Sequence, residues 1–257
     1  MANRPRAEVT GFPVLSGRRP PRLWLRARDE AIIGSARLFS GACGVAVSGA
    51  ENLPARGPYI IAANHASHLD SLLVAANLPG TIWRQLVCLA AKEWFHTPVL
   101  GWLARAGAAI PIDRQGACNL SSLHEAMDRL RSGLNLLVFP AGRRSRTGEV
   151  EPFKPGVGFL SFETGAPVVP LYLGGTFEIL PRWRRIPSLH PISIRIGAPL
   201  RAESYRSYAA SSPFRYKVYK RIAGDAHSAV CALAGETLSA PSPLLGRWQV
   251  RQKEATC

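Results

Sequence analysis

Apolar and polar residues alternate along this chain with two different periods, and these periods predict its secondary structure. Short, continuous apolar runs are typical of buried strands, and apolar residues three or four positions apart are typical of helices. The runs predict strands at 45–48, 59–63, 86–90, 135–139 and 168–173. The helical spacing predicts helices at 70–77, 97–106, 119–131 and 157–164. This alternation predicts a single α/β domain, with a mixed, mostly parallel sheet flanked by helices.

The beginning of the chain follows a different pattern. Its first 22 residues are rich in Pro, Gly and Arg and are predicted to form a basic arm. Segment 21–39 predicts an amphipathic helix, in which Leu25, Ile32 and Phe39 recur near helical spacing between arginines. Two interpretations are open. The segment lies in a membrane interface with Trp24 at headgroup depth, or it docks on the domain with its arginines in solvent.

Composition divides the chain into three predicted parts. Residues 1–40 form the basic arm and a membrane-associating segment, residues 41–201 the α/β domain, and residues 202–257 a C-terminal helical extension with a basic tail. Arg37 interrupts the best candidate span, so no run approaches the ~20 apolar residues that a membrane-spanning helix needs. We expect a protein that lies on a membrane rather than one that crosses it.

The charge of the chain favours anionic partners. It has 32 Lys and Arg residues against 17 Asp and Glu, which gives a net charge of +15. Lipid headgroups, nucleic acid and an acidic carrier protein all fit such a charge. The five cysteines show no C-x-x-C spacing, which argues against a disulfide framework and a zinc site and favours a reducing cytoplasm. We therefore expect neither a disulfide framework nor a zinc site.

The most informative chemistry follows the strand predicted at 59–63. That strand ends at Asn64 and His65, and Asp70 follows five residues after the histidine. An imidazole can take a proton from an alcohol near neutral pH, and a carboxylate at its other ring nitrogen fixes the tautomer and stabilises the imidazolium. The pair indicates an enzyme that makes a hydroxyl group nucleophilic. A nucleophilic Ser67 is disfavoured because it lies in no G-x-S-x-G turn and fits a helix start.

Four short blocks carry a resemblance to a known family. They are Asn64-His65-x4-Asp70, the arginine that ends Ile110-Pro-Ile-Asp-Arg114, Phe139-Pro-Ala-Gly-Arg-Arg-Ser145, and Val168-Val-Pro-Leu171. In order and rough spacing they resemble the four blocks of the glycerolipid acyltransferase superfamily, which includes the 1-acylglycerol-3-phosphate acyltransferases. The resemblance covers residues 45–200 and extends to Phe153-Lys-Pro-Gly156.

The resemblance implies an O-acyltransferase. Such an enzyme moves a fatty acyl group from acyl-CoA or an acidic acyl carrier protein to the hydroxyl of a lysophospholipid-like acceptor. His65 then acts as the general base with Asp70 as its orienter, and no covalent enzyme intermediate is needed. No metal and no redox cofactor is implied. The protein is expected to lie peripherally on the cytoplasmic face of a membrane, bound to its anionic surface.

Substrate-binding residues are expected around this pair. Arg114 and Arg144 are the predicted anion holders, since a guanidinium binds phosphate oxygens through two parallel hydrogen bonds. The alternative for each is an exposed loop arginine. The backbone at Gly142 is expected to face the ligand, because a loop after a buried strand is the usual place for a site in an α/β sheet. The further substrate-binding candidates are Asn64, Arg143 and Lys154.

The third block departs from the family pattern at two positions. The family commonly has Phe-Pro-Glu-Gly-Thr-Arg-Ser, where this chain has Ala141 in place of Glu and Arg143 in place of Thr. One carboxylate is lost and one cation is gained, so the local charge is expected to shift by about two units. The way in which the family holds a glycerol phosphate acceptor therefore does not carry over intact.

Two other functions remain open. Arginine clusters at 18–19, 143–146 and 182–185 suggest a nucleic-acid-binding protein. The chain shows no finger, P-loop or aromatic RNA platform, however, and we expect no nucleic-acid partner. The altered third block is also consistent with a superfamily member that binds lipid without turnover. Transfer of a labelled acyl group, salt-sensitive retention on DNA, and liposome binding without turnover distinguish the three.

Overall fold

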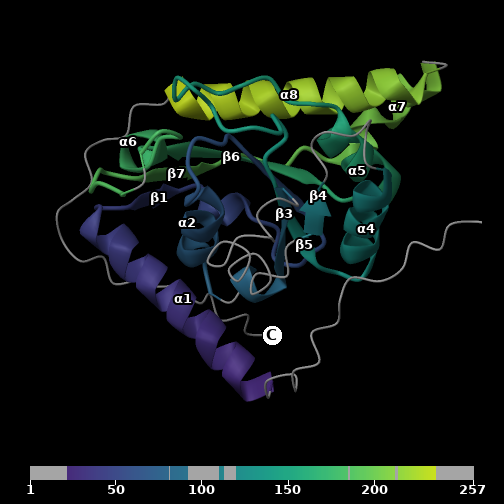
Figure 1. Ribbon diagram of the computed structural model, residues 1–257. Helices are drawn as coiled ribbons and strands as arrows, with labels where there is room; N and C mark the ends of the chain where they lie inside the picture. Colours follow the sequence, from purple (N-terminus) through teal and green to yellow (C-terminus); the bar gives the residue numbers. More distant parts are fainter. Residues whose placement is uncertain are drawn as a thin grey trace, which may run out of the picture.

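The computed structural model describes residues 22–80, 82–91, 110–112, 120–184, 186–211 and 214–235. In this part of the chain, one sheet carries helices on both of its faces (Figure 1). The strands are β1 (Ala46–Ser48), β2 (Ile60–Ala63), β3 (Leu86–Ala91), β4 (Ile110–Ile112), β5 (Asn135–Val138), β6 (Val168–Gly174) and β7 (Ser193–Ile196). The helices are α1 (Arg22–Ala42), α2 (Asp70–Asn77), α4 (Leu120–Arg131), α5 (Gly156–Thr164), α6 (Thr176–Ile179), α7 (Arg206–Ser211) and α8 (Arg215–Gly235).

The order of the strands places β2 at the centre of the sheet. The order is β1-β7-β6-β2-β5-β3-β4, and adjacent strands are parallel except for the antiparallel pair of β6 and β7. The prediction of a mixed, mostly parallel sheet is thereby confirmed. Because β6 and β5 flank β2 and run parallel to it, the residues that follow these three strands share one edge of the sheet.

Both faces of the sheet are buried, which explains why its central strands are continuous apolar runs. In β2, Ile61 and Ala63 face a core that includes Leu73 of α2. Ile60 and Ala62 face a second core, built with residues of α4, α5 and α8. Successive side chains of a strand point to opposite faces, so this short strand is held from both sides and positions the residues after it firmly.

The predicted strands and helices of the α/β domain agree with the observed ones within one residue at each end where both exist, whereas α1 extends three residues beyond the helix predicted at 21–39. The predicted helix at 97–106 lies outside the described residues. The pattern does not predict β4 or β7. Strand β4 is only three residues long and has a central proline. Strand β7 is interrupted by the polar residue Arg195. Arg195 is buried because its guanidinium donates hydrogen bonds to the carbonyls of Leu233 and Ala234 at the end of α8, a contact that no local pattern reveals.

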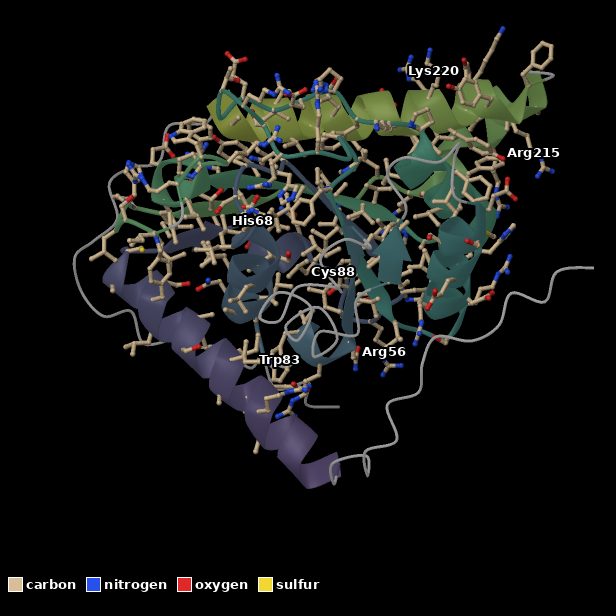
Figure 2. All side chains as sticks on the ribbon, in the orientation of Figure 1. Arg56, His68, Trp83, Cys88, Arg215 and Lys220 are labelled. Atoms are coloured by element: carbon tan, nitrogen blue, oxygen red, sulfur yellow. The ribbon has the colours of Figure 1, made fainter. Side chains whose placement is uncertain are left out.

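Helix α1 docks on α2. Its Ile33 and Ala36 pack against Ala76 of α2, and Trp83, labelled in Figure 2, packs against the same cluster. The Arg37 Nε donates a hydrogen bond to the carbonyl of Ala76 at 2.9 Å. Of the two interpretations of segment 21–39, the structure therefore shows docking on the domain, and contact with a membrane stays a prediction. None of the described helices combines the length and the apolar content that crossing a bilayer requires.

The region after residue 201 contains α7 and α8, where one or two helices are predicted. Helix α8 does not stand apart from the sheet, because it packs along β6 and α5 (Figure 1). The predicted basic tail lies outside the described residues. The division of the chain at residues 40 and 201 stays a prediction.

The contact of α5 with α8 yields a prediction about stability. A Cβ atom at Gly158 would lie 2.1 Å from the backbone oxygen of Tyr219. Gly158→Ala is therefore expected to lower the free energy of unfolding by about 3 kcal/mol. The helix backbone at Tyr219 cannot move aside to relieve the clash, as a flexible side chain could. Gly224→Ala on α8 is the matched control. Its Cβ meets nothing within 4 Å, and it should stabilise the protein by ~0.5–1 kcal/mol. Equal unfolding midpoints in urea for the two variants would contradict this packing.

Candidate active site

The residues of the first and third blocks meet at the edge of the sheet where β2 and β5 end. Asn64 and His65 directly follow β2, Asp70 begins α2, and the third block begins at Phe139, directly after β5. His68, which lies between His65 and Asp70 in the sequence, marks this edge beside α2 in Figure 2. The parallel pairing of β2 with β5 thus brings together two blocks that are about seventy residues apart in the sequence.

His65 and Asp70 form a close, buried pair. The Nδ1 atom of His65 lies 2.7 Å from Oδ2 of Asp70. The same oxygen accepts hydrogen bonds from the backbone N–H groups of Ala66 at 2.7 Å and Ser67 at 2.9 Å. Because a carboxylate oxygen only accepts hydrogen bonds, the neutral form of this imidazole carries its proton on Nδ1 and its lone pair on Nε2. This is the tautomer that a general base needs.

Two further contacts orient the imidazole, and the sequence analysis singled out neither. The ring stacks on Phe139, with the centroids 4.1 Å apart and the planes inclined by 20°. The backbone N–H of Ser145 donates to the carbonyl of His65 at 2.7 Å. Both partners belong to the third block, so the loop after β5 holds the imidazole of His65 in position. The sequence placed Phe139 and Ser145 in the third block but gave no sign that they contact His65, because these contacts join segments that are distant in the sequence.

Asn64 connects two strands of the sheet. Its side-chain oxygen accepts from the N–H of Leu173 at 2.7 Å, and its Nδ2 donates to the carbonyl of the same residue at 2.8 Å. The side chain is buried. This geometry makes Asn64 a positioning residue that ties the end of β2 to β6. Its predicted contact with substrate stays a prediction.

The third-block loop, which we define as residues 139–155 between β5 and α5, brings Gly142 and Lys154 together. Gly142 has a φ of 76°, in the left-handed region that favours glycine, and its N–H donates to the carbonyl of Phe139 at 2.9 Å. A Cβ at this position would lie 3.0 Å from Nζ of Lys154. The N–H of Lys154 donates to the carbonyl of Pro140 at 3.1 Å, which holds the two segments together. The exposed ammonium of Lys154 therefore lies directly over the loop.

The arginines of the block differ in their surroundings. The Arg143 side chain is 65% exposed and pairs with Glu151, with Nη2 and Oε2 3.0 Å apart. Glu151 thus offsets the cation gained at Arg143, and the local change in charge is smaller than the block alone implies. Arg144 is half-buried beside it. Arg114 lies outside the described residues. No sequence signal indicated Glu151, because the loop brings it to Arg143 from eight residues away.

Ser67 and Cys88 are two other side chains of this region that could in principle act as nucleophiles. Ser67 is buried, and its Oγ accepts a hydrogen bond from the N–H of Leu69 at 3.2 Å, as a residue at a helix start does. Burial raises the pKa of the Cys88 thiol to about 12, although a hydrogen bond with Ser71 lowers it slightly. The thiol is therefore protonated at neutral pH and is not a nucleophile. Among the described residues, no three His, Cys, Asp or Glu side chains gather as metal ligands would.

Comparison with known proteins places the four blocks in a family. The family model described as Acyltransferase matches residues 44–174. The chain is 35% identical over 148 residues to the 1-acyl-sn-glycerol-3-phosphate acyltransferase of Limnanthes douglasii, covering 56% of this chain and 50% of that protein. It is 34% identical over 146 residues to the enzyme of the same name from Saccharomyces cerevisiae, covering 53% and 45%. The chain thus spans about half of the length of these relatives.

A solved structure shares the fold. The crystal structure of the 1-acyl-sn-glycerophosphate acyltransferase PlsC from Thermotoga maritima matches with a TM-score of 0.61, 22% identity, and coverage of 83% of this chain and 84% of that one. The residues matched by the family model include the four blocks, together with β2, α2 and β5, which carry the His65–Asp70 pair and the loop around it. The chain belongs to the acyltransferase family, within the glycerolipid acyltransferase superfamily.

Proposed function

We propose that this protein transfers a fatty acyl group from an acyl thioester, carried by coenzyme A or an acyl carrier protein, to the hydroxyl of a lysophospholipid. The observation that carries the proposal is the buried contact of His65 Nδ1 with Asp70 Oδ2, which leaves Nε2 as a base. The names of the relatives support the acceptor class, because both are 1-acyl-sn-glycerol-3-phosphate acyltransferases.

The geometry permits direct transfer. The acceptor hydroxyl gives its proton to Nε2 of His65 while its oxygen attacks the thioester carbonyl carbon. The carbon–sulfur bond then breaks, the acyl group becomes an ester of the acceptor, and the departing thiolate takes the proton from the imidazolium. The negative charge of Asp70 stabilises that imidazolium. This reaction needs no metal and no redox cofactor, since the imidazole supplies the acid and the base.

The anionic parts of the substrates would meet the cations of the third-block loop. Arg144 and Lys154 lie on that loop, which contacts His65 through Phe139 and Ser145. The Arg143 side chain is 65% exposed and can exchange its partner Glu151 for a phosphate at small cost, since ion pairs at the surface contribute only ~0–1 kcal/mol. We place Arg114 in the same role from the resemblance alone. The protein would work peripherally, at the cytoplasmic face of an anionic membrane that holds the lysolipid.

A direct assay tests the proposal. The purified chain is incubated with acyl-CoA or acyl carrier protein bearing a labelled acyl group, together with a panel of lysolipids, and the products are identified by mass spectrometry. Formation of a diacyl phospholipid with release of the free thiol supports the proposal. Binding of liposomes without any acyl transfer would instead identify a lipid-binding member without turnover, and salt-sensitive retention on DNA would favour the nucleic-acid alternative.

The altered third block predicts a change in acceptor choice. The double change Ala141→Glu with Arg143→Thr is expected to raise kcat/KM for lysophosphatidate, relative to the acceptor that the unmodified protein prefers, by roughly tenfold to hundredfold. A hydrogen bond to a charged group contributes ~1.5–3 kcal/mol, which corresponds to such a factor. Arg215→Thr is the matched control, because it breaks another exposed arginine–glutamate pair, with Glu163, at the far end of the molecule. If the unmodified protein already prefers lysophosphatidate and the double variant behaves identically, these two positions do not set the acceptor.

A further inference from the structure

The loop after α6 presents a group of large apolar side chains to solvent. Trp183, Ile186 and Leu189 are 68%, 77% and 66% exposed, and they are close in the sequence. We call residues 180–190 the α6 loop, which is described except for residue 185. Exposed apolar side chains that are grouped rather than scattered mark surfaces that bind a partner.

The α6 loop is held in one conformation by its own polar contacts. Nη1 of Arg184 donates to Oγ of Ser188 at 2.8 Å and to the carbonyl of Glu178 at 3.3 Å. The ring of Trp183 packs edge-on against Phe177, with the centroids 5.5 Å apart. These contacts close the loop on α6. The exposed side chains are therefore displayed by an organised turn rather than by a loose segment.

The charges around the apolar side chains are mainly positive. Arg182 and Trp183 line an open hollow together with Arg146 from the third-block loop. Arg184 donates its described hydrogen bonds to a carbonyl and a hydroxyl rather than to a carboxylate, so these bonds leave its charge uncompensated. Apolar side chains that alternate with guanidinium groups fit a lipid interface. The apolar side chains enter the region where headgroups meet acyl chains, and the guanidinium groups bind lipid phosphates. Nucleic acid would offer no comparable partner to Ile186.

The α6 loop lies close to the active site. Arg146 directly follows Ser145, whose N–H donates to the carbonyl of His65. Gly148, on the same segment, approaches α6 so closely that a Cβ there would lie 3.2 Å from the ring of Phe177. The third-block loop therefore touches the base on one side and the α6 loop on the other.

We propose that the α6 loop docks on an anionic lipid surface, with Trp183, Ile186 and Leu189 at headgroup depth and the arginines on lipid phosphates. Docking in this way would place His65 next to the layer that contains the lysolipid. That consequence for catalysis rests on the proposed function, whereas the docking itself does not. The surface is separate from segment 21–39, which packs on α2.

Vesicle binding tests the docking. The triple variant Trp183→Ser, Ile186→Ser, Leu189→Ser is expected to lose at least about tenfold in partition coefficient on vesicles of phosphatidylcholine with phosphatidylglycerol. Raised salt, or vesicles of phosphatidylcholine alone, should weaken binding of the unmodified protein. The matched control is Phe214→Ser with Tyr216→Ser, which removes side chains 62% and 60% exposed at the end of α8 away from α6 (Figure 1) and should bind as the unmodified protein does.

Fluorescence locates the contact. Lipids with brominated acyl chains should quench the unmodified protein more than Trp183→Phe, because this change keeps an apolar ring but removes the inserted indole. The proposal is overturned if the triple variant binds vesicles as well as the control does, or if quenching is equal in the two proteins. It is also overturned if the unmodified protein leaves vesicles unbound and forms a dimer that the triple variant does not form.

Activity distinguishes failure of the docking from failure of the proposed function. The triple variant should keep its turnover of a short-chain lysolipid below its micellar concentration and lose turnover only with acceptor embedded in vesicles. If the unmodified protein transfers no acyl group to either acceptor while the binding and quenching results hold, the docking stands and the proposed function fails. Equal turnover of vesicle-embedded acceptor by both proteins would overturn the orienting role of the loop.

Discussion

His65→Ala is expected to lower kcat/KM for acyl transfer by about 10²–10⁴, the range typical of a lost general base. The loss follows from the removal of Nε2, which is the proposed base in the tautomer set by Asp70. The truncation also removes the stacking of the imidazole on Phe139, and the buried carboxylate of Asp70 loses one of its hydrogen-bond donors. A fall in stability of about 2 kcal/mol is therefore expected as well, and turnover must be measured on folded protein.

Two variants separate chemistry from folding. His65→Asn can keep a donor near the position of Nδ1 but has no equivalent of Nε2, so it should recover part of the stability and none of the turnover. His68→Ala removes a histidine of the same segment that lies outside the proposed machinery and should change kcat/KM by less than about threefold. Near-normal turnover by folded His65→Ala or His65→Asn would remove the proposed mechanism.

Asp70→Asn is expected to lower kcat on the order of 10²-fold, because a hydrogen bond to a charged group contributes ~1.5–3 kcal/mol to the stabilisation of the imidazolium. The asparagine oxygen can take the place of Oδ2 and accept from Ala66, Ser67 and His65. Its amide group would then occupy the place of Oδ1, a buried atom with no hydrogen-bond partner among the described residues. An unsatisfied buried donor costs about 1–3 kcal/mol, so unfolding should occur at lower urea concentration.

A carboxylate elsewhere on the surface serves as the control for this change. Asp225 accepts from Tyr205 at 3.0 Å and from Arg221 at 3.1 Å, both on the α7 and α8 side of the molecule. Asp225→Asn removes the same charge and should leave kcat within about twofold. If Asp70→Asn transfers acyl groups as fast as Asp225→Asn, the carboxylate does not assist the base.

The central strands could be predicted from the sequence because their burial is uniform. The apolar runs around β2, β5 and β6 are unbroken, since both faces of each strand are covered, and their limits agree with the structure within one residue. Strand β7, which lies between β1 and β6, could not be predicted in this way. Its Arg195 is polar in sequence and becomes a buried residue only through the carbonyl groups at the end of α8.

At the candidate site, too, local contacts could be predicted from the sequence and long-range contacts could not. The approach of His65 to Asp70 could be anticipated because both residues lie in one short segment, where a strand passes into the first turn of a helix. The stack on Phe139 and the hydrogen bond from Ser145 could not, because they join segments that are distant in sequence. The pairing of Arg143 with Glu151 depends on the path of a loop, and it changed the charge that the third block alone predicted.

The sequence by itself thus determined which chemical groups are present and which of them are local neighbours: an imidazole, its carboxylate, a set of cations and the strands that carry them. The tertiary structure decided what orients the imidazole and which surface adjoins it. Strand pairing brings the loop after β5 to His65, and packing on α6 brings the exposed Trp183 to the other side of that loop. Such contacts depend on the closure of long loops around two cores, and their identity follows from the packing of the whole domain rather than from any local pattern.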